Sequence, residues 1–101
     1  MAQLLGDAAV GKALAQLTGW IGDQEVIVRT VELPSFPAAI VAVVDVAKFA
    51  EEIDHHPDID IRWRSVTFRL TTHSAGGVTE SDVTLATRID EIVTRILDQE
   101  S

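Results

Sequence analysis

The residues in this sequence best suited to chemistry are its three histidines, His55, His56 and His73. His55 and His56 stand side by side after a run of acidic residues, and His73 follows the next apolar run. Because an imidazole changes charge nearest to neutral pH, two of them can give and take a proton within one turnover. The sequence therefore predicts an active site built around these side chains.

The two adjacent histidines are expected to have different roles. Pro57 disfavours helical backbone at His56, which should therefore be extended. Neighbouring side chains of an extended segment point to opposite sides. One imidazole could then line a pocket while the other holds the loop by hydrogen bonding. Carboxylates nearby, such as Glu51 and Asp54, would favour the charged imidazolium, which suits a general acid.

Two other interpretations of the histidines stay open. They could be ordinary polar residues at the ends of helices and strands, as a single histidine usually is. With a carboxylate, the three could also ligate zinc. The zinc site is the weaker interpretation, because adjacent side chains diverge and the sequence has neither cysteine nor a His-x-x-x-His pair.

Composition and charge exclude several classes of protein. The 101 residues suffice for one small domain and carry a formal net charge of −8, with a pI near 4.6. Such a surface would repel nucleic acid and anionic membranes. Without cysteine there can be no disulfide or thiolate site. No secretory signal or membrane-spanning stretch is recognisable, so a cytoplasmic protein is expected.

Hydrophobic periodicity and turn residues predict the order helix, two strands, helix, two strands, helix. The predicted elements cover residues 1–19, 20–21, 26–33, 36 to 53 or 54, 59–63, 66–72 and 80 to about 97. Hairpins joined by helices give an α+β two-layer domain, in which a four-stranded antiparallel sheet is covered on one face by helices. We expect residues 1–101 to form this single domain.

Caps and apolar faces refine the helices. Asp7 and Ser35 are the predicted N-caps of the first two helices. A capping box over residues 79–82 predicts the start of the last helix, and this structural role is assigned to Asp82 in preference to catalysis. The predicted apolar faces are Phe36, Ile40, Val43, Ala47 and Ala50 in the second helix and Val83, Ala86, Ile89, Val93 and Ile96 in the last.

The order and spacing of these residues resemble a known family signature. The pattern runs Glu51, three residues, His55-His56-Pro57, five residues, Trp63, nine residues, His73, eight residues, Asp82. It resembles the signature of the pterin-4a-carbinolamine dehydratases. The similarity covers nearly the whole chain, roughly residues 14–93.

The resemblance implies dehydration of 4a-hydroxytetrahydropterin to quinonoid dihydropterin, which recycles the pterin cofactor of aromatic amino acid hydroxylases. His55 and His73 would be the acid and base of this catalytic set, and His56 would bind and orient the pterin. The substrate would be surrounded by Glu51, Asp54, Pro57, Trp63 and Thr72. The resemblance further implies no metal or bound cofactor, a homodimer or homotetramer, and an aromatic amino acid hydroxylase as a partner.

A binding module is the alternative function. Relatives of this fold serve as a dimerisation cofactor of a homeodomain transcription factor and as assembly factors for a carboxylating enzyme. A purely scaffolding protein would have little reason to keep His55, His56 and His73 together, and this favours the enzyme. The fold alone would not decide between the two.

Overall fold

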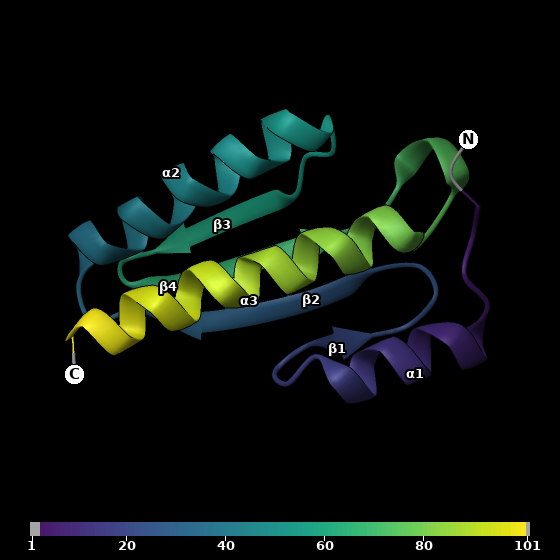
Figure 1. Cartoon of the computed structure of the whole chain (residues 1–101), viewed down its shortest axis with the longest axis horizontal. Coiled ribbons are helices and arrows are strands. Elements are labelled where there is room, and N and C mark those ends of the chain that lie inside the picture. The colour runs from purple at the N-terminus through teal and green to yellow at the C-terminus, as the bar shows by residue number, and fades with distance from the viewer. Residues whose placement is uncertain (1–2, 101) are drawn as a thin grey trace.

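A four-stranded antiparallel sheet in the order β1-β2-β4-β3 forms one layer of the molecule (Figure 1). The structure, a computed structural model, describes residues 3–100. Its elements are α1 (Asp7–Gln16), β1 (Ile21–Gly22), β2 (Ile27–Glu32), α2 (Phe36–Ile53), β3 (Asp58–Arg62), β4 (Ser65–Leu70), the short 3₁₀ helix η1 (His73–Ala75) and α3 (Glu80–Glu100). This order and the antiparallel sheet confirm the predicted α+β fold.

The two faces of the sheet differ in polarity. Strand β2 pairs with β4 so that Thr30 lies opposite Thr67 on the outer face, where their hydroxyl oxygens are 2.8 Å apart. The next pair along the two strands, Val31 opposite Val66, faces inward and is buried. Antiparallel sheets commonly have one solvated face and one face against the core. The helices are thus needed on one side only.

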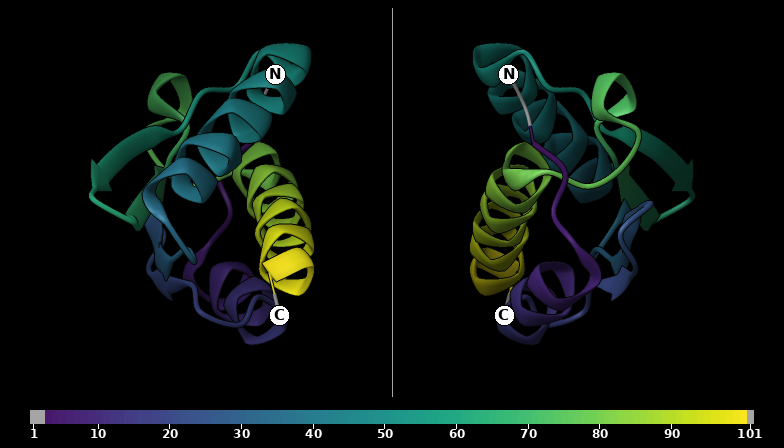
Figure 2. Two further views of the ribbon diagram at one scale, coloured as in Figure 1. Left: turned by 90° about the vertical axis from the view of Figure 1, so that its left-hand side faces the viewer. Right: turned by 90° about the vertical axis from the view of Figure 1, so that its right-hand side faces the viewer.

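Helices α2 and α3 lie against each other on the inner face of the sheet, and α1 lies beside α3 near β1, away from α2 (Figure 2). The core includes Val10 and Leu17 from the α1 region, Phe68 from β4, and Ile89 from α3. Burying a side chain as large as Phe68 stabilises the fold by roughly 1.5–3 kcal/mol. None of the helices within residues 3–100 combines the length and apolar character needed to cross a bilayer.

A part-buried polar contact joins the sheet to α3. The indole Nε1 of Trp20 donates a hydrogen bond to Asp90 Oδ1 at 2.8 Å, and Arg29 Nη1 contacts the same oxygen at 2.5 Å. Trp20 is only 4% exposed. The polar edge of a buried indole usually finds a partner of this kind. Trp20 is therefore a core residue.

The first helix is shorter than predicted, and its predicted cap is wrong. α1 begins at Asp7 with Gly6 as its N-cap, because the preceding chain is extended: the Leu5 N–H donates to the carbonyl oxygen of Val78 at 2.9 Å. Asp7 is thus in the first turn, where a carboxylate still favours the helix through the macrodipole. The predicted residues 1 and 2 of this helix lie outside the described part of the chain.

The predicted apolar face of α2 is largely wrong. The buried residues of this helix are Ala38, Ala39, Ala42, Val46 and Ala50. Of the predicted face only Ala50 is buried; Phe36, Ile40 and Ala47 are exposed, and Val43 is half-buried. Small alanines let the helix axis approach its neighbours closely, so the larger side chains point outward. The predicted cap is confirmed, since the Ala38 N–H donates to Ser35 Oγ at 3.2 Å.

Most of the face predicted for α3 is confirmed. Ala86, Ile89, Val93 and Ile96 are buried, and Val83 packs against the core. The helix continues to Glu100, however, beyond the predicted end near Leu97.

The predicted break between the third and fourth strands is also confirmed, but Trp63 is not in a strand. Arg62 pairs with Ser65, so Trp63 and Arg64 form a two-residue turn. Trp63 has φ +60° and is 77% exposed. A bulky residue seldom adopts positive φ, and the tight connection between β3 and β4 imposes it here.

Candidate active site

The backbone at the end of α2 places the two adjacent histidines. Asp54 adopts left-handed backbone with φ 51°, and its N–H bonds to the carbonyl oxygen of Glu51 at 3.3 Å. The His55 N–H reaches back to the carbonyl oxygen of Ala50 at 3.0 Å. Together these bonds form a Schellman motif, which ends a helix and turns the chain sharply. Asp54 thereby directs His55 back toward the start of α3.

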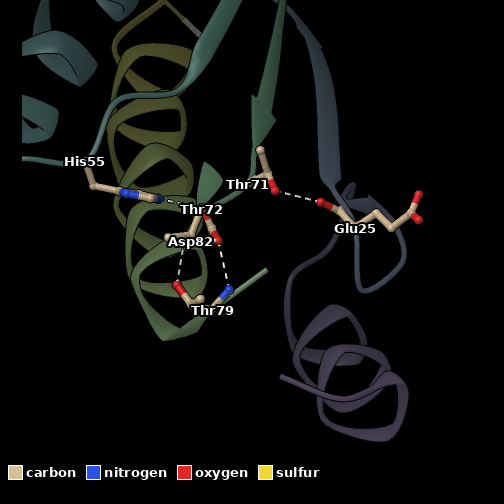
Figure 3. Close-up of polar contacts among 6 residues, drawn as sticks. All are labelled: Glu25, His55, Thr71, Thr72, Thr79 and Asp82. Carbon is tan, nitrogen blue, oxygen red and sulfur yellow. Dashed lines mark hydrogen bonds and ion pairs between the residues drawn. The ribbon is translucent and has the colours of Figure 1, made fainter. Parts of the chain in front are cut away.

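His55 pairs with a buried carboxylate. Its Nε2 lies 2.6 Å from Oδ1 of Asp82, which is fully buried, and the His55 side chain itself is 15% exposed. Figure 3 shows the imidazole pointing toward Asp82. The two residues are 27 positions apart in the chain. The end of α2 is thus joined to the first turn of α3.

The other oxygen of Asp82 accepts two further hydrogen bonds (Figure 3). The Thr72 hydroxyl donates to Oδ2 at 2.8 Å, and the Thr79 N–H donates to it at 2.9 Å. The Thr72 and Thr79 hydroxyl oxygens are 2.7 Å apart. A buried carboxylate would be costly without such partners, and these three donors compensate for its lost hydration. Asp82 therefore keeps its predicted helix-capping bond and has two further partners, Thr72 and His55, that the capping pattern did not reveal.

A closed turn fixes Thr72 and the residue after it. The Thr72 N–H donates to the Gly77 carbonyl oxygen at 2.9 Å, and the Thr71 hydroxyl donates to the Glu25 carbonyl oxygen at 2.7 Å (Figure 3). Gly77 has no room for a side chain, since a Cβ there would lie 2.6 Å from the carbonyl oxygen of Gln24. The segment is thus held on both sides where β4 ends.

His73 begins this turn, directly after Thr72. Its side chain is exposed and, within residues 3–100, makes no hydrogen bond or ion pair. Because Thr72 bonds to the carboxylate that holds His55, the backbone of His73 comes to the same end of the molecule. An imidazole without a protein partner is free to bind a ligand.

His56 points away from this cluster and pairs with Glu51. Its Nε2 lies 2.8 Å from Glu51 Oε1, and both side chains are exposed. The pair stands at an apolar groove of about 560 Å³, lined by Val44, Ala47, Lys48, Ala50, Glu51, His56, Pro57 and Ile59. The divergence of His55 and His56 is the one predicted from extended backbone before a proline. An exposed ion pair of this kind contributes only about 0–1 kcal/mol.

Trp63 is the predicted site residue that the structure leaves apart. Pro57 precedes β3 and Trp63 follows it, and a strand of this length separates its ends by about 13 Å. The Trp63 ring instead lies against Arg64 of the same chain, whose guanidinium carbon is 5.8 Å from the ring centroid. Its role in substrate binding stays a prediction.

The described residues offer no group of three or more histidine and acidic side chains placed to hold a metal. His55 and His56 turn to different carboxylates, Asp82 and Glu51. The arrangement is that of two separately oriented imidazoles, which can transfer protons.

Sequence reasoning missed two members of the site: Asp82 as the partner of His55, and Thr79. A capping box uses one oxygen of its acidic residue, and the second oxygen was a signal that this carboxylate needed another donor once buried. The identity of that donor depends on the tertiary fold.

Comparison with known proteins identifies the family of the chain. The model of the family described as pterin 4 alpha carbinolamine dehydratase matches residues 3–92. The chain belongs to this family. Relatives that carry the family's name include one from Roseiflexus sp. (strain RS-1), 57% identical over 92% of this chain and 100% of its own, and one from Nocardia farcinica (strain IFM 10152), 54% identical over 89% and 95%.

Two solved structures share the fold of this dehydratase family member. A transcriptional coactivator/pterin dehydratase from Brucella melitensis superimposes with a TM-score of 0.86 at 32% identity, over 90% of this chain and 99% of that one. A pterin dehydratase-like protein identified as a RuBisCO assembly factor in the alpha-carboxysome gives 0.60 at 20% identity, over 73% and 86%. The second likeness concerns the fold alone.

Proposed function

We propose that this protein removes water from 4a-hydroxytetrahydropterin to give quinonoid dihydropterin. The observation that supports this most directly is His55, held by the buried Asp82 at the same end of the molecule as the exposed His73. Family membership supplies the substrate class. A histidine oriented by a carboxylate is a recurring arrangement for proton transfer.

In the proposed reaction one histidine of the pair His55 and His73 protonates the departing 4a-hydroxyl as the C4a–O bond breaks. The other removes a proton from the pterin ring, so the net change is loss of one water molecule. Proton transfers of this kind contribute about 10²–10⁴-fold each. The carbinolamine also loses water unaided, so a modest acid–base pair is sufficient. No metal or bound cofactor takes part in this proposal.

The remaining predicted site residues are proposed to bind the pterin. His56 and Glu51 stand together at the groove beside α2, and Pro57 lines the same groove. Asp54 and Thr72 adjoin His55 and His73 in the chain. Trp63 could reach a ligand only from another copy of the chain, because it lies at the opposite end of β3.

The decisive experiment follows the decay of 4a-hydroxytetrahydropterin by absorbance with and without enzyme. We expect the wild type to accelerate this decay, and His55→Ala and His73→Ala each to reduce kcat by about 10²–10⁴-fold. Ser74→Ala, a change at the exposed neighbour of His73, is the matched control and should behave as the wild type. A wild-type rate equal to that of the buffer would reject the dehydratase.

A non-catalytic scaffold on the same fold is the second candidate, favoured by the RuBisCO assembly factor that shares this fold. Calorimetric titration with a dihydropterin separates the two candidates. A folded protein that releases no heat would support the scaffold, whereas binding abolished by His56→Ala would support the pterin site.

We further propose an assembly of two or four copies within the cytoplasm, each copy a single domain of residues 1–101, with an aromatic amino acid hydroxylase producing the substrate. The exposed apolar side chains of α2, among them Ile40, Val41 and Val44, favour self-association. The acidic surface, with a net charge of −8, makes nucleic acid or an anionic membrane an unfavourable partner.

A further inference from the structure

The hydrogen bonds around Asp82 determine where the protons of the cluster lie. The Thr79 N–H can only donate, and it donates to Oδ2. The Thr72 hydroxyl donates to the same oxygen, so the Thr79 hydroxyl must donate to the Thr72 oxygen in turn. With two donors at Oδ2 and the N-terminus of α3 beside it, the buried side chain is a carboxylate, which accepts hydrogen bonds only.

The tautomer of His55 follows from this arrangement. Oδ1 of Asp82 accepts the remaining hydrogen bond, so the proton in the 2.6 Å contact belongs to His55 Nε2. In a neutral imidazole one nitrogen is protonated and the other is not. Nδ1 of His55 therefore carries the lone pair.

The position of His55 Nδ1 allows it to exchange a proton with a substrate. Within residues 3–100 every buried side-chain nitrogen and oxygen has a hydrogen-bond partner. Among the same residues the His55 ring makes its hydrogen bond through Nε2 and none through Nδ1. His55 Nδ1 has no such partner among these residues, so it is not one of the buried nitrogens and must reach solvent. Nδ1 is therefore accessible to a substrate.

We propose that Thr72, Thr79 and Asp82 form a positioning network that fixes the tautomer of His55, and that His55 Nδ1 is the atom that exchanges a proton with the pterin. This inference rests on the proposed dehydratase function and names its reacting nitrogen. In the reaction Nδ1 accepts or donates one proton, while the proton on Nε2 stays in its hydrogen bond to Asp82. The carboxylate stabilises the imidazolium whenever both nitrogens are protonated.

Asp82→Asn provides a sharp test because the network leaves the new amide one orientation. The Thr79 N–H still requires an acceptor at the position of Oδ2, so the amide oxygen must lie there and the NH₂ group must face His55. Nε2 then has to accept, and the proton moves to Nδ1. The variant keeps nearly the same shape but has the opposite tautomer, which leaves Nδ1 without a lone pair.

The tautomer is measured by nitrogen NMR of histidine-labelled protein at a pH where the imidazole is neutral, with His56→Gln and His73→Gln to assign the signals. We expect protonated Nε2 in the wild type and protonated Nδ1 in Asp82→Asn, with kcat reduced about 10²–10⁴-fold. Protonated Nδ1 in the wild type would overturn the inference, and so would an Asp82→Asn variant with unchanged tautomer and kcat.

A milder set of variants guards against misfolding. Thr72→Val removes one of the two donors to Oδ2. We expect kcat to fall about 5–30-fold, as for a lost hydrogen bond of about 1–2 kcal/mol. Thr72→Ser restores the hydroxyl and should restore the rate. Thr84→Val, an exposed change on the same helix, is the control. Equal rates for Val and Ser at position 72 would contradict a positioning role.

The NMR measurement and the activity assay test the inference and the proposed function separately. The NMR measurement needs no substrate, so it reports on the network even in an inactive protein. Protonated Nε2 without any dehydration would reject the proposed function together with the role of Nδ1 in it. Dehydration with protonated Nδ1 would reject the inference and leave the proposed function intact.

Discussion

At the scale of single residues, Asp82 shows how one carboxylate can have a structural and a chemical partner. Oδ2 accepts the Thr79 N–H that begins α3, and Oδ1 accepts the His55 ring. The sequence could predict the first bond, because it lies within one helical turn. The second partner is 27 positions away and could not be predicted from local spacing.

Asp54 is a residue whose backbone and side chain have separable tasks. Its φ of 51° is easier for glycine than for other residues, so Asp54→Gly should raise the free energy of unfolding by up to about 1 kcal/mol. Asp54→Val should lower it by about 1–2 kcal/mol. Urea unfolding measures both free energies of unfolding.

If the Asp54 carboxylate binds pterin, Asp54→Gly will also raise KM with kcat nearly unchanged. A glycine variant less stable than the wild type would contradict the helix-ending role of this backbone.

At the scale of helices and strands, local patterns predicted the type and order of the elements but did not always predict which face is buried. The last helix mixes polar and apolar residues, so its inward face was evident. Helix α2 is apolar on nearly every side, and periodicity could not choose between its faces. The structure buries the alanines, because close packing against α3 and the sheet needs small side chains. Strand β3 ends one residue before Trp63, since turn geometry rather than alternation decides that boundary.

Two glycines make a matched test of the turn after β4. A Cβ at Gly77 would lie 2.6 Å from the Gln24 carbonyl oxygen, whereas a Cβ at Gly11, inside α1, meets nothing within 4 Å. Gly77→Ala should therefore lower the free energy of unfolding by about 1–3 kcal/mol, as steric clashes with backbone do. Gly11→Ala should raise it by about 0.5–1 kcal/mol through better helix propensity. Thermal and urea unfolding give both values, and a Gly77→Ala variant as stable as wild type would show that the loop can move aside.

At the scale of the whole molecule, the candidate site joins the end of α2 to two later segments, the end of β4 and the start of α3. The sequence predicted that the histidines matter, and the structure divides them between two surfaces. His55 turns toward Asp82, and His56 turns toward Glu51 at the groove. This division depends on the direction in which α2 ends, which the left-handed Asp54 sets.

Self-association is the prediction for the molecule as a whole. Val41 on α2 is 50% exposed and lies outside the groove that includes His56, so Val41→Glu should weaken assembly without touching the site. Light scattering should give a multiple of 11.0 kDa for the wild type and a smaller mass for this variant. Thr84→Glu adds the same charge on the exposed side of α3 and should leave the mass unchanged. A wild-type mass of a single chain would contradict the assembly.

The two tryptophans occupy opposite environments. Trp20 is enclosed and bonded to Asp90, while Trp63 stands at the tip of the β3–β4 turn in contact with solvent. A quencher dissolved in water will dim the emission of Trp63 and spare that of Trp20. The chain thus carries two native optical reporters: docking at the hairpin tip would alter only the outer one, and unfolding would alter both.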